Sequence, residues 1–151
     1  AQTRALWRLR EDISETLWHW QPYKNDISVR VSKMSDFLAE VDQLVAARYP
    51  DFEIVWYGHI GDGNLHLNIL KPEDLPQTEF FERCGIVSLE IGELLARYGG
   101  SISAEHGVGL LKKSLLPYSR SPVEIALMRS IKKTFDPKSI LNPGKVFDSL
   151  T

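Results

Sequence analysis

The feature that most constrains the fold is a pair of β-type segments on either side of a tight turn. Residues 53–60 and 65–70 are rich in β-branched, aromatic and alternating apolar residues, and Gly61-Asp62-Gly63-Asn64 separates them. An Asp-Gly pair at the centre of a two-residue turn is a strong β-hairpin signal, because both turn positions adopt positive φ angles. The sequence therefore predicts an antiparallel hairpin centred on Asp62-Gly63, in which His59 faces His66 directly.

This register places the two histidines that flank the turn on one face of the hairpin. Directly opposed residues have Cβ atoms about 4.5–5.5 Å apart, which is close enough for two imidazoles to bind one metal ion. Asn68 falls on the same face as His66, because side chains alternate along a strand. The opposite face of the second strand carries Leu65, Leu67 and Ile69. We therefore expect one polar face and one face that packs in the core.

Helical periodicity surrounds this hairpin. Apolar residues spaced by three and four predict helices over about residues 1–20, from Ser32 or Ser35 until Pro50, and over about 78–98 and 122–135. Short alternating patterns predict two further strands, at residues 27–31 and 101–105. This order of elements predicts an α+β domain, a ferredoxin-like sandwich in which helices pack mainly on one face of an antiparallel sheet.

A third candidate metal ligand ends the predicted strand 101–105. Glu105 lies on the polar side of that strand and completes a set of two histidines and one carboxylate with His59 and His66. Such a set leaves coordination positions open for a substrate, whereas structural zinc sites are usually closed by four protein ligands. His106 follows directly and can turn toward the same metal. The spacing of the two histidines alone is equally consistent with exposed side chains that bind no metal.

Composition excludes several classes of protein. Hydrophobic residues make up 43% of the 151 residues and charged residues 25%, the averages of globular proteins, so a disordered or collagen-like chain is excluded. A net charge of −2, with both signs interspersed, argues against nucleic acid as a partner. No run approaches the roughly 20 apolar residues of a transmembrane segment. The single cysteine, Cys84, excludes an internal disulfide.

Three motifs resemble the C-terminal part of FAD-linked 2-hydroxyacid dehydrogenases of the vanillyl-alcohol oxidase superfamily. They are GHIGDGNLH at residues 58–66, SAEHGVG at 103–109 and DPKSILNPGK at 136–145, and weaker similarity runs back to about Trp7. Arg30 stands where that family usually has proline. The resemblance leaves the substrate open among D-2-hydroxyglutarate, D-lactate, glycolate and similar acids.

The resemblance implies a role for nine side chains. It implies that His59, His66 and Glu105 bind a divalent metal, usually zinc, and that His106 is the general base. It implies that the residues in contact with the substrate are Arg10, Ser14, Lys24 and Asn68, and that Asn142 approaches the flavin. Arg10 and Lys24 would supply positive charge for a substrate carboxylate.

The resemblance also implies how this chain is used. Residues 1–151 would be a single C-terminal substrate and metal domain, with the N-terminal FAD-binding domain of the same polypeptide as its main partner. A chain that begins Ala-Gln-Thr without Met suits this expectation. The whole protein would oxidise a D-2-hydroxyacid to the 2-oxoacid, by metal-assisted proton abstraction and hydride transfer to FAD, while the isolated chain would be inactive.

Several properties stay open at this point. The electron acceptor would be an electron-transfer flavoprotein, a quinone or a similar carrier, and a homodimer is one allowed assembly. The location would be the cytoplasm in a bacterium or the mitochondrial matrix in a eukaryote. The alternative function is a non-enzymatic regulatory module that binds a metal or a small acid.

Overall fold

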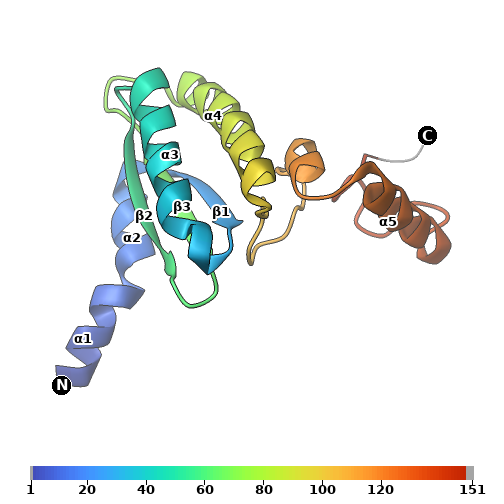
Figure 1. Ribbon diagram of the computed structural model, residues 1–151, viewed down its shortest axis with the longest axis horizontal. Helices are drawn as coiled ribbons and strands as arrows, with labels where there is room; N and C mark the ends of the chain where they lie inside the picture. Colours follow the sequence, from blue (N-terminus) through green and yellow to red (C-terminus); the bar gives the residue numbers. More distant parts are fainter. Residues whose placement is uncertain (1, 149–151) are drawn as a thin grey trace.

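A three-stranded antiparallel sheet forms the centre of the molecule in a computed structural model that describes residues 2–148 (Figure 1). Its strands are β1 (Tyr23–Ser28), β2 (Glu53–His59) and β3 (Asn64–Leu70), arranged in the order β1-β3-β2. The α-helices are α1 (Gln2–Glu11), α2 (Ile13–Leu17), α3 (Met34–Arg48), α4 (Gln77–Tyr98) and α5 (Pro122–Phe135). Short 3-10 helices are η1 (Trp18–Trp20), η2 (Val31–Lys33) and η3 (Lys113–Tyr118). This content confirms the predicted α+β class.

The core lies between one face of the sheet and the two central helices. Leu67 and Ile69 of the central strand β3 are fully buried, and they share one cluster with residues of α3 and α4. The contributions of the helices to that cluster include Phe37, Val41, Val45, Phe80, Cys84, Val87, Ile91 and Leu95. Helices α3 and α4 therefore cover the apolar face of the sheet, as predicted, and the opposite face is left for polar side chains.

The hairpin register differs from the prediction. His59 pairs with Asn64, and His66 pairs with Tyr57, so residues 60–63 form a four-residue loop and the prediction that His59 faces His66 directly is wrong. The Asp62 carboxylate accepts the backbone N–H of Asn64 at 3.0 Å and closes the longer loop. Each residue has shifted its partner by two positions, which preserves the alternation of faces. His59 and His66 are therefore diagonal neighbours on the same face.

The two shorter predicted strands also differ. The strand expected at residues 27–31 is Tyr23–Ser28, and Val31 instead begins the 3-10 helix η2. The strand expected at 101–105 is reduced to one bridge, between Ser28 and Ser101. Backbone N–H groups of residues 104–106 bond to a side chain, the carboxylate of Asp26, and so do not extend a sheet ladder. The fourth strand was predicted wrongly for this reason.

The terminal helices expose their apolar side chains. The first predicted helix is divided into α1, α2 and η1, and of its apolar stripe only Leu17 is buried within the described part of the chain. Within residues 2–148, α5 has no buried residue, and Phe135 at its end is 78% exposed. Helix α5 lies beyond η3, apart from the sheet (Figure 1). Among the described helices, none has the length and hydropathy required to span a membrane.

Candidate functional site

The polar face of the sheet gathers the candidate site residues. Side chains alternate along each strand, so β1 contributes Lys24 and Asp26 to this face, opposite Asn68 and His66 of β3. The other residues on this face include Tyr57 and His59 of β2 and Asn64 of β3. The three strands thus present amide, imidazole, carboxylate and ammonium groups beside one another.

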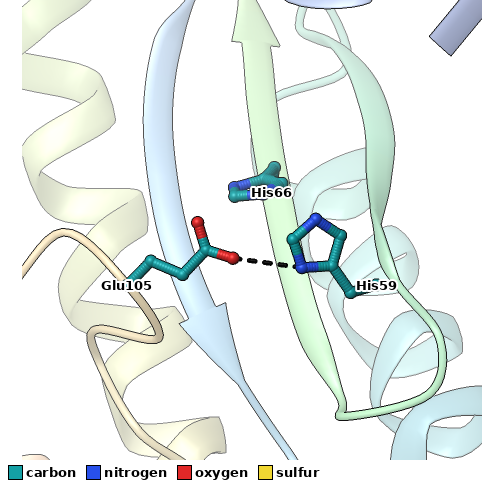
Figure 2. Close-up of side chains that lie close together, drawn as sticks. All are labelled: His59, His66 and Glu105. Atoms are coloured by element: carbon teal, nitrogen blue, oxygen red, sulfur yellow. Dashed lines mark ion pairs between the residues drawn. The ribbon is translucent and has the colours of Figure 1, made fainter. Parts of the chain in front are cut away.

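Three predicted metal ligands come together on this face. Each of His59, His66 and Glu105 offers one ligand atom, and these atoms lie within 4.8 Å of one another. Figure 2 shows the Glu105 carboxylate directed at the ring of His59, with the ring of His66 beside them. His59 Nδ1 lies 3.0 Å from Glu105 Oε1, and the two imidazole centroids are 5.7 Å apart. The two histidines come from strands, whereas Glu105 comes from the loop that follows α4.

Asn64 belongs to this cluster, although the sequence did not assign it a role. Its side-chain nitrogen donates to Glu105 Oε1 and lies 3.3 Å from His59 Nδ1. Asn64 is 3% exposed. The signal that would have identified it is the register itself, because Asn64 is the residue directly opposite His59.

Asp26 is a second residue that the sequence analysis missed. Its carboxylate is 2% exposed, and Oδ2 accepts the backbone N–H groups of Ala104, Glu105 and His106 at 3.1, 2.9 and 2.9 Å. The same oxygen accepts the hydroxyl of Ser103 at 3.3 Å. Asp26 therefore ties the loop that carries two candidate functional side chains to strand β1.

The electrostatics of the cluster follow from burial and these hydrogen bonds. Burial raises the pKa of Asp26, but the backbone N–H groups of His106 and Glu105 and the charge of Lys112 outweigh it, so the pKa lies below its ordinary value. Burial lowers the pKa of His66, and the charges of Asp26 and Glu105 only partly oppose that effect. The His66 imidazole is therefore neutral near pH 7, which is the form that binds a metal.

Two adjoining cavities contain the predicted substrate contacts. One, of about 230 Å³, is lined by residues that include Ser14, Lys24, Asn68 and His106. A second, of about 340 Å³, is lined by residues that include Arg10, Ser14, His59 and His66. Ser14, Tyr57 and His66 line both, so the two cavities meet at one of the three predicted metal ligands.

The cationic side chains project over these cavities from the N-terminal helices and β1. The Lys24 ammonium donates to the Ser14 hydroxyl at 2.9 Å, which brings α2 against the polar face. An Arg10 guanidinium nitrogen lies 3.4 Å from His59 Nε2. His106 is 63% exposed in its side chain, with its ring centroid 6.0 Å from that of His66. Eight of the nine predicted side chains therefore surround one site.

A comparison with known families gives a match over most of the chain. The family model described as FAD linked oxidases, C-terminal domain, matches residues 1–146. This chain belongs to that family. The matched range includes all nine side chains, from Arg10 to Asn142, whose roles were predicted from the sequence.

Similar proteins of the FAD linked oxidase family carry one name in several organisms. The chain is 60% identical over 146 residues to the D-2-hydroxyglutarate dehydrogenase of Stutzerimonas stutzeri (strain A1501), and 56% identical over 149 residues to that of Xanthomonas citri pv. viticola. These alignments cover 97% and 99% of this chain and 32% of each relative. The mitochondrial D-2-hydroxyglutarate dehydrogenase of Danio rerio is 42% identical, over 94% of this chain and 26% of the relative. The chain thus spans about a third of the length of its bacterial relatives.

Asn142 is the predicted residue that this FAD linked oxidase domain does not bring to the cluster. It lies in the segment after α5, and among the described residues it lines neither of the two cavities. Its φ angle is 46°, in the left-handed region that asparagine tolerates better than most residues. The predicted approach of Asn142 to a flavin stays a prediction.

Proposed function

We propose that this chain is the substrate- and metal-binding domain of an FAD-dependent dehydrogenase that oxidises a D-2-hydroxyacid to the 2-oxoacid. The remainder of the longer protein would contain the FAD-binding domain. The observation that carries the proposal is the convergence of the His59, His66 and Glu105 ligand atoms within 4.8 Å, beside two adjoining cavities, of which Lys24 lines one and Arg10 the other. The relatives named D-2-hydroxyglutarate dehydrogenase make D-2-hydroxyglutarate the first substrate to test.

The donor set fits zinc. Two imidazoles and one carboxylate are ligands that Zn²⁺ accepts, and three protein ligands are the usual number in a catalytic zinc site. His66 is neutral near pH 7 because burial lowers its pKa. The Asn64 amide, which donates to Glu105, orients that carboxylate toward His59. The three ligands would therefore hold the metal on the polar face and leave coordination positions for a substrate.

The two cationic side chains, Lys24 and Arg10, suit a dicarboxylate. Lys24 is held by Ser14 at 2.9 Å, and both line the cavity that His66 and Glu105 also line. Arg10 lines the adjoining cavity. A carboxylate bound by Lys24 and Arg10 would direct the other end of a short 2-hydroxyacid toward the metal ligands. A monocarboxylic acid such as D-lactate would leave these cationic side chains without a partner, which favours D-2-hydroxyglutarate.

His106 is the proposed general base. Its ring centroid lies 6.0 Å from that of His66, and it lines the same cavity as Lys24 and Asn68, where it would take the proton of the substrate hydroxyl. The exposure of the ring gives the proton a path to water. A metal bound at the site would polarise the substrate hydroxyl, and FAD bound by the rest of the protein would accept the hydride. Asn68, which is 1% exposed, would contact the substrate with its side-chain amide.

The experiment is anaerobic bleaching of the flavin in the full-length protein by a panel of 2-hydroxyacids. We expect D-2-hydroxyglutarate to reduce the flavin rapidly, His106→Asn to slow this step by at least 100-fold, and His19→Asn to behave like the parent protein. His19 is a suitable control because it is the only one of the four histidines that is not a candidate site residue. Flavin bleaching that is unaffected by His106→Asn would contradict the assigned base. A protein that binds zinc but is bleached by no acid would instead support the regulatory alternative.

A further inference from the structure

We propose that Asp26 is a positioning residue that fixes both the Glu105–His106 loop and the ring of His66, so that one buried carboxylate aligns two of the three metal ligands. This inference rests on the proposed function, because it assumes that the three ligands hold a metal. The proposal rests on the hydrogen bonds of Asp26 and on its pairing with His66 in the sheet.

Asp26 holds the loop that carries Glu105 and His106. Three consecutive backbone N–H groups, of residues 104–106, converge on one oxygen of Asp26 at 2.9–3.1 Å. Successive N–H groups arranged in this way form a binding site for an anion, here the side chain of a strand residue. Within residues 2–148, the backbone of this loop pairs with the sheet only at the bridge between Ser101 and Ser28, so the backbone at Glu105 and His106 is held mainly by Asp26.

Lys112 strengthens this arrangement from the other side of the loop. Its ammonium donates to the backbone carbonyls of Asp26 and Ile102, both at 2.8 Å, and lies 3.9 Å from Asp26 Oδ2. Lys112 therefore joins the strand to the beginning of the loop and places a positive charge near the carboxylate. The negative charge of Asp26 is balanced by this lysine and by the three N–H dipoles, and it does not require a proton.

Asp26 also lies beside the ring of His66. Asp26 and His66 are direct partners in the β1–β3 ladder, and Asp26 Oδ1 lies 3.7 Å from His66 Nδ1. Within residues 2–148, Asp26 Oδ1 is buried without a hydrogen-bond partner. A buried carboxylate oxygen in that state is costly, and a ring movement of less than 1 Å would bring Nδ1–H to hydrogen-bond distance.

That hydrogen bond would decide which ring nitrogen is available. A proton held on Nδ1 by Asp26 leaves the lone pair of His66 on Nε2. Histidines that bind metals usually donate their other N–H to a carboxylate or carbonyl, and loss of such a partner typically weakens metal binding by about 10–100-fold. Asp26 would therefore set the tautomer of one ligand through Oδ1 and the position of another through Oδ2.

The test compares two carboxylates in the full-length protein. Asp136 is the matched control, because it is 4% exposed and its carboxylate also accepts two backbone N–H groups, of Ile140 and Leu141, at 2.9 Å. We expect Asp26→Asn to weaken Zn²⁺ binding about 10–100-fold in competition with a chromophoric chelator, and to change the absorption spectrum of bound Co²⁺. We expect Asp136→Asn to leave both unchanged.

A second measurement needs no variant at position 26. The ¹⁵N spectrum of histidine-labelled protein, with His66→Gln used to assign the ring signals, should show His66 protonated on Nδ1 before zinc is added. A proton on Nε2, or equal zinc affinity and Co²⁺ spectra for Asp26→Asn and the parent, would overturn the positioning role. If the parent protein itself binds no zinc, the proposed function fails instead, so the two failures are distinguishable.

Discussion

Replacement of Gly63 by alanine tests whether the four-residue hairpin loop positions the proposed metal ligands. Gly63 has a φ of +80°, and a Cβ added there would lie 1.9 Å from the carbonyl oxygen of Val29. That oxygen belongs to the backbone directly after β1, so it cannot move aside as the end of a flexible side chain could. The Gly63 carbonyl also accepts the N–H of Val29 at 3.1 Å, so both the N–H and the carbonyl of Val29 lie against Gly63. An alanine would push them apart.

The expected destabilisation follows from these contacts. The left-handed backbone costs about 1–2 kcal/mol for a residue with a Cβ, and loss of the Val29 hydrogen bond costs about 1 kcal/mol. Gly63→Ala should therefore lower the free energy of unfolding by about 2–3 kcal/mol in urea denaturation of the 151-residue chain. His59 ends β2 directly before this loop, so the displacement should also move His59. Because the side chains of a metal site must be held within about 0.5 Å of their productive positions, Zn²⁺ binding should weaken by at least 10-fold.

Gly61 in the same loop provides the control. No described atom lies within 4 Å of a Cβ built at Gly61, and Gly61 is not among the described residues with positive φ. Gly61→Ala should change the free energy of unfolding by no more than about 0.5 kcal/mol and leave zinc affinity unchanged. Equal stability and zinc affinity of Gly63→Ala and the parent chain would refute this account of the loop.

Three further predictions concern the rest of the domain. Leu67 is fully buried in the central strand, so Leu67→Ala should reduce the free energy of unfolding by about 2–5 kcal/mol in urea; a loss below 1 kcal/mol would contradict its place in the core. Burial raises the pKa of the Cys84 thiol to about 12, so a thiol reagent at pH 8 should modify Cys84 only after unfolding, and rapid labelling of the folded chain would be inconsistent with that burial. The hydrogen bond from Lys132 holds the pKa of Asp136 below its ordinary value of 3.8, against the opposing effect of burial, with help from two backbone N–H groups. The stability that Asp136 contributes should therefore be fully present above about pH 3.8 and be lost as the pH falls through the lower pKa that Asp136 has in the folded state. If the free energy of unfolding depends on pH in the same way in the parent chain and in Asp136→Asn, this contribution is excluded.

Local patterns predicted the regular elements well. Apolar spacing identified α3, α4 and α5 almost to their ends, because each is long and either packs one face on the sheet or carries strong terminal signals. Helix α5 begins with the capping box of Ser121 and Glu124 and with Pro122 in its first turn, all of which are local features. Such signals need no knowledge of the rest of the chain.

The failures occurred where a distant or unexpected hydrogen bond determines the backbone. The register of the hairpin changed because the Asp62 side chain accepts the N–H of Asn64 and stabilises a four-residue loop. The fourth predicted strand is absent from the described residues because Asp26, nearly 80 residues earlier, accepts the N–H groups that a ladder would have used. Neither bond is visible in a pattern of apolar and polar residues.

The candidate ligands were found in spite of the register error, and the reason is geometric. A change of two positions in the pairing leaves every side chain on its original face, whereas a change of one would have moved His66 into the core. The alternation of Leu65, Leu67 and Ile69 excludes the latter, since these side chains must be buried. The burial of Leu65, Leu67 and Ile69 therefore determines that His66 lies on the polar face, whichever turn joins the two strands.

Asp26 is needed because the sheet alone does not position all of the candidate site residues, and the hydrogen bonds that give it this role join residues far apart in the sequence. The strands hold His59 and His66 in place through backbone pairing, but the sheet does not position Glu105 and His106, which lie in a loop broken by glycines with positive φ. A ligand on a loop is placed as accurately as the groups that anchor the loop. Here the anchor is a carboxylate that faces the same side of the sheet as the histidines, so the cost of burying its charge is offset only when the loop folds over it. The proposed metal ligands and the buried acid are then parts of one arrangement, in which the sheet positions the backbone of His59 and His66, and Asp26 positions the backbone of Glu105.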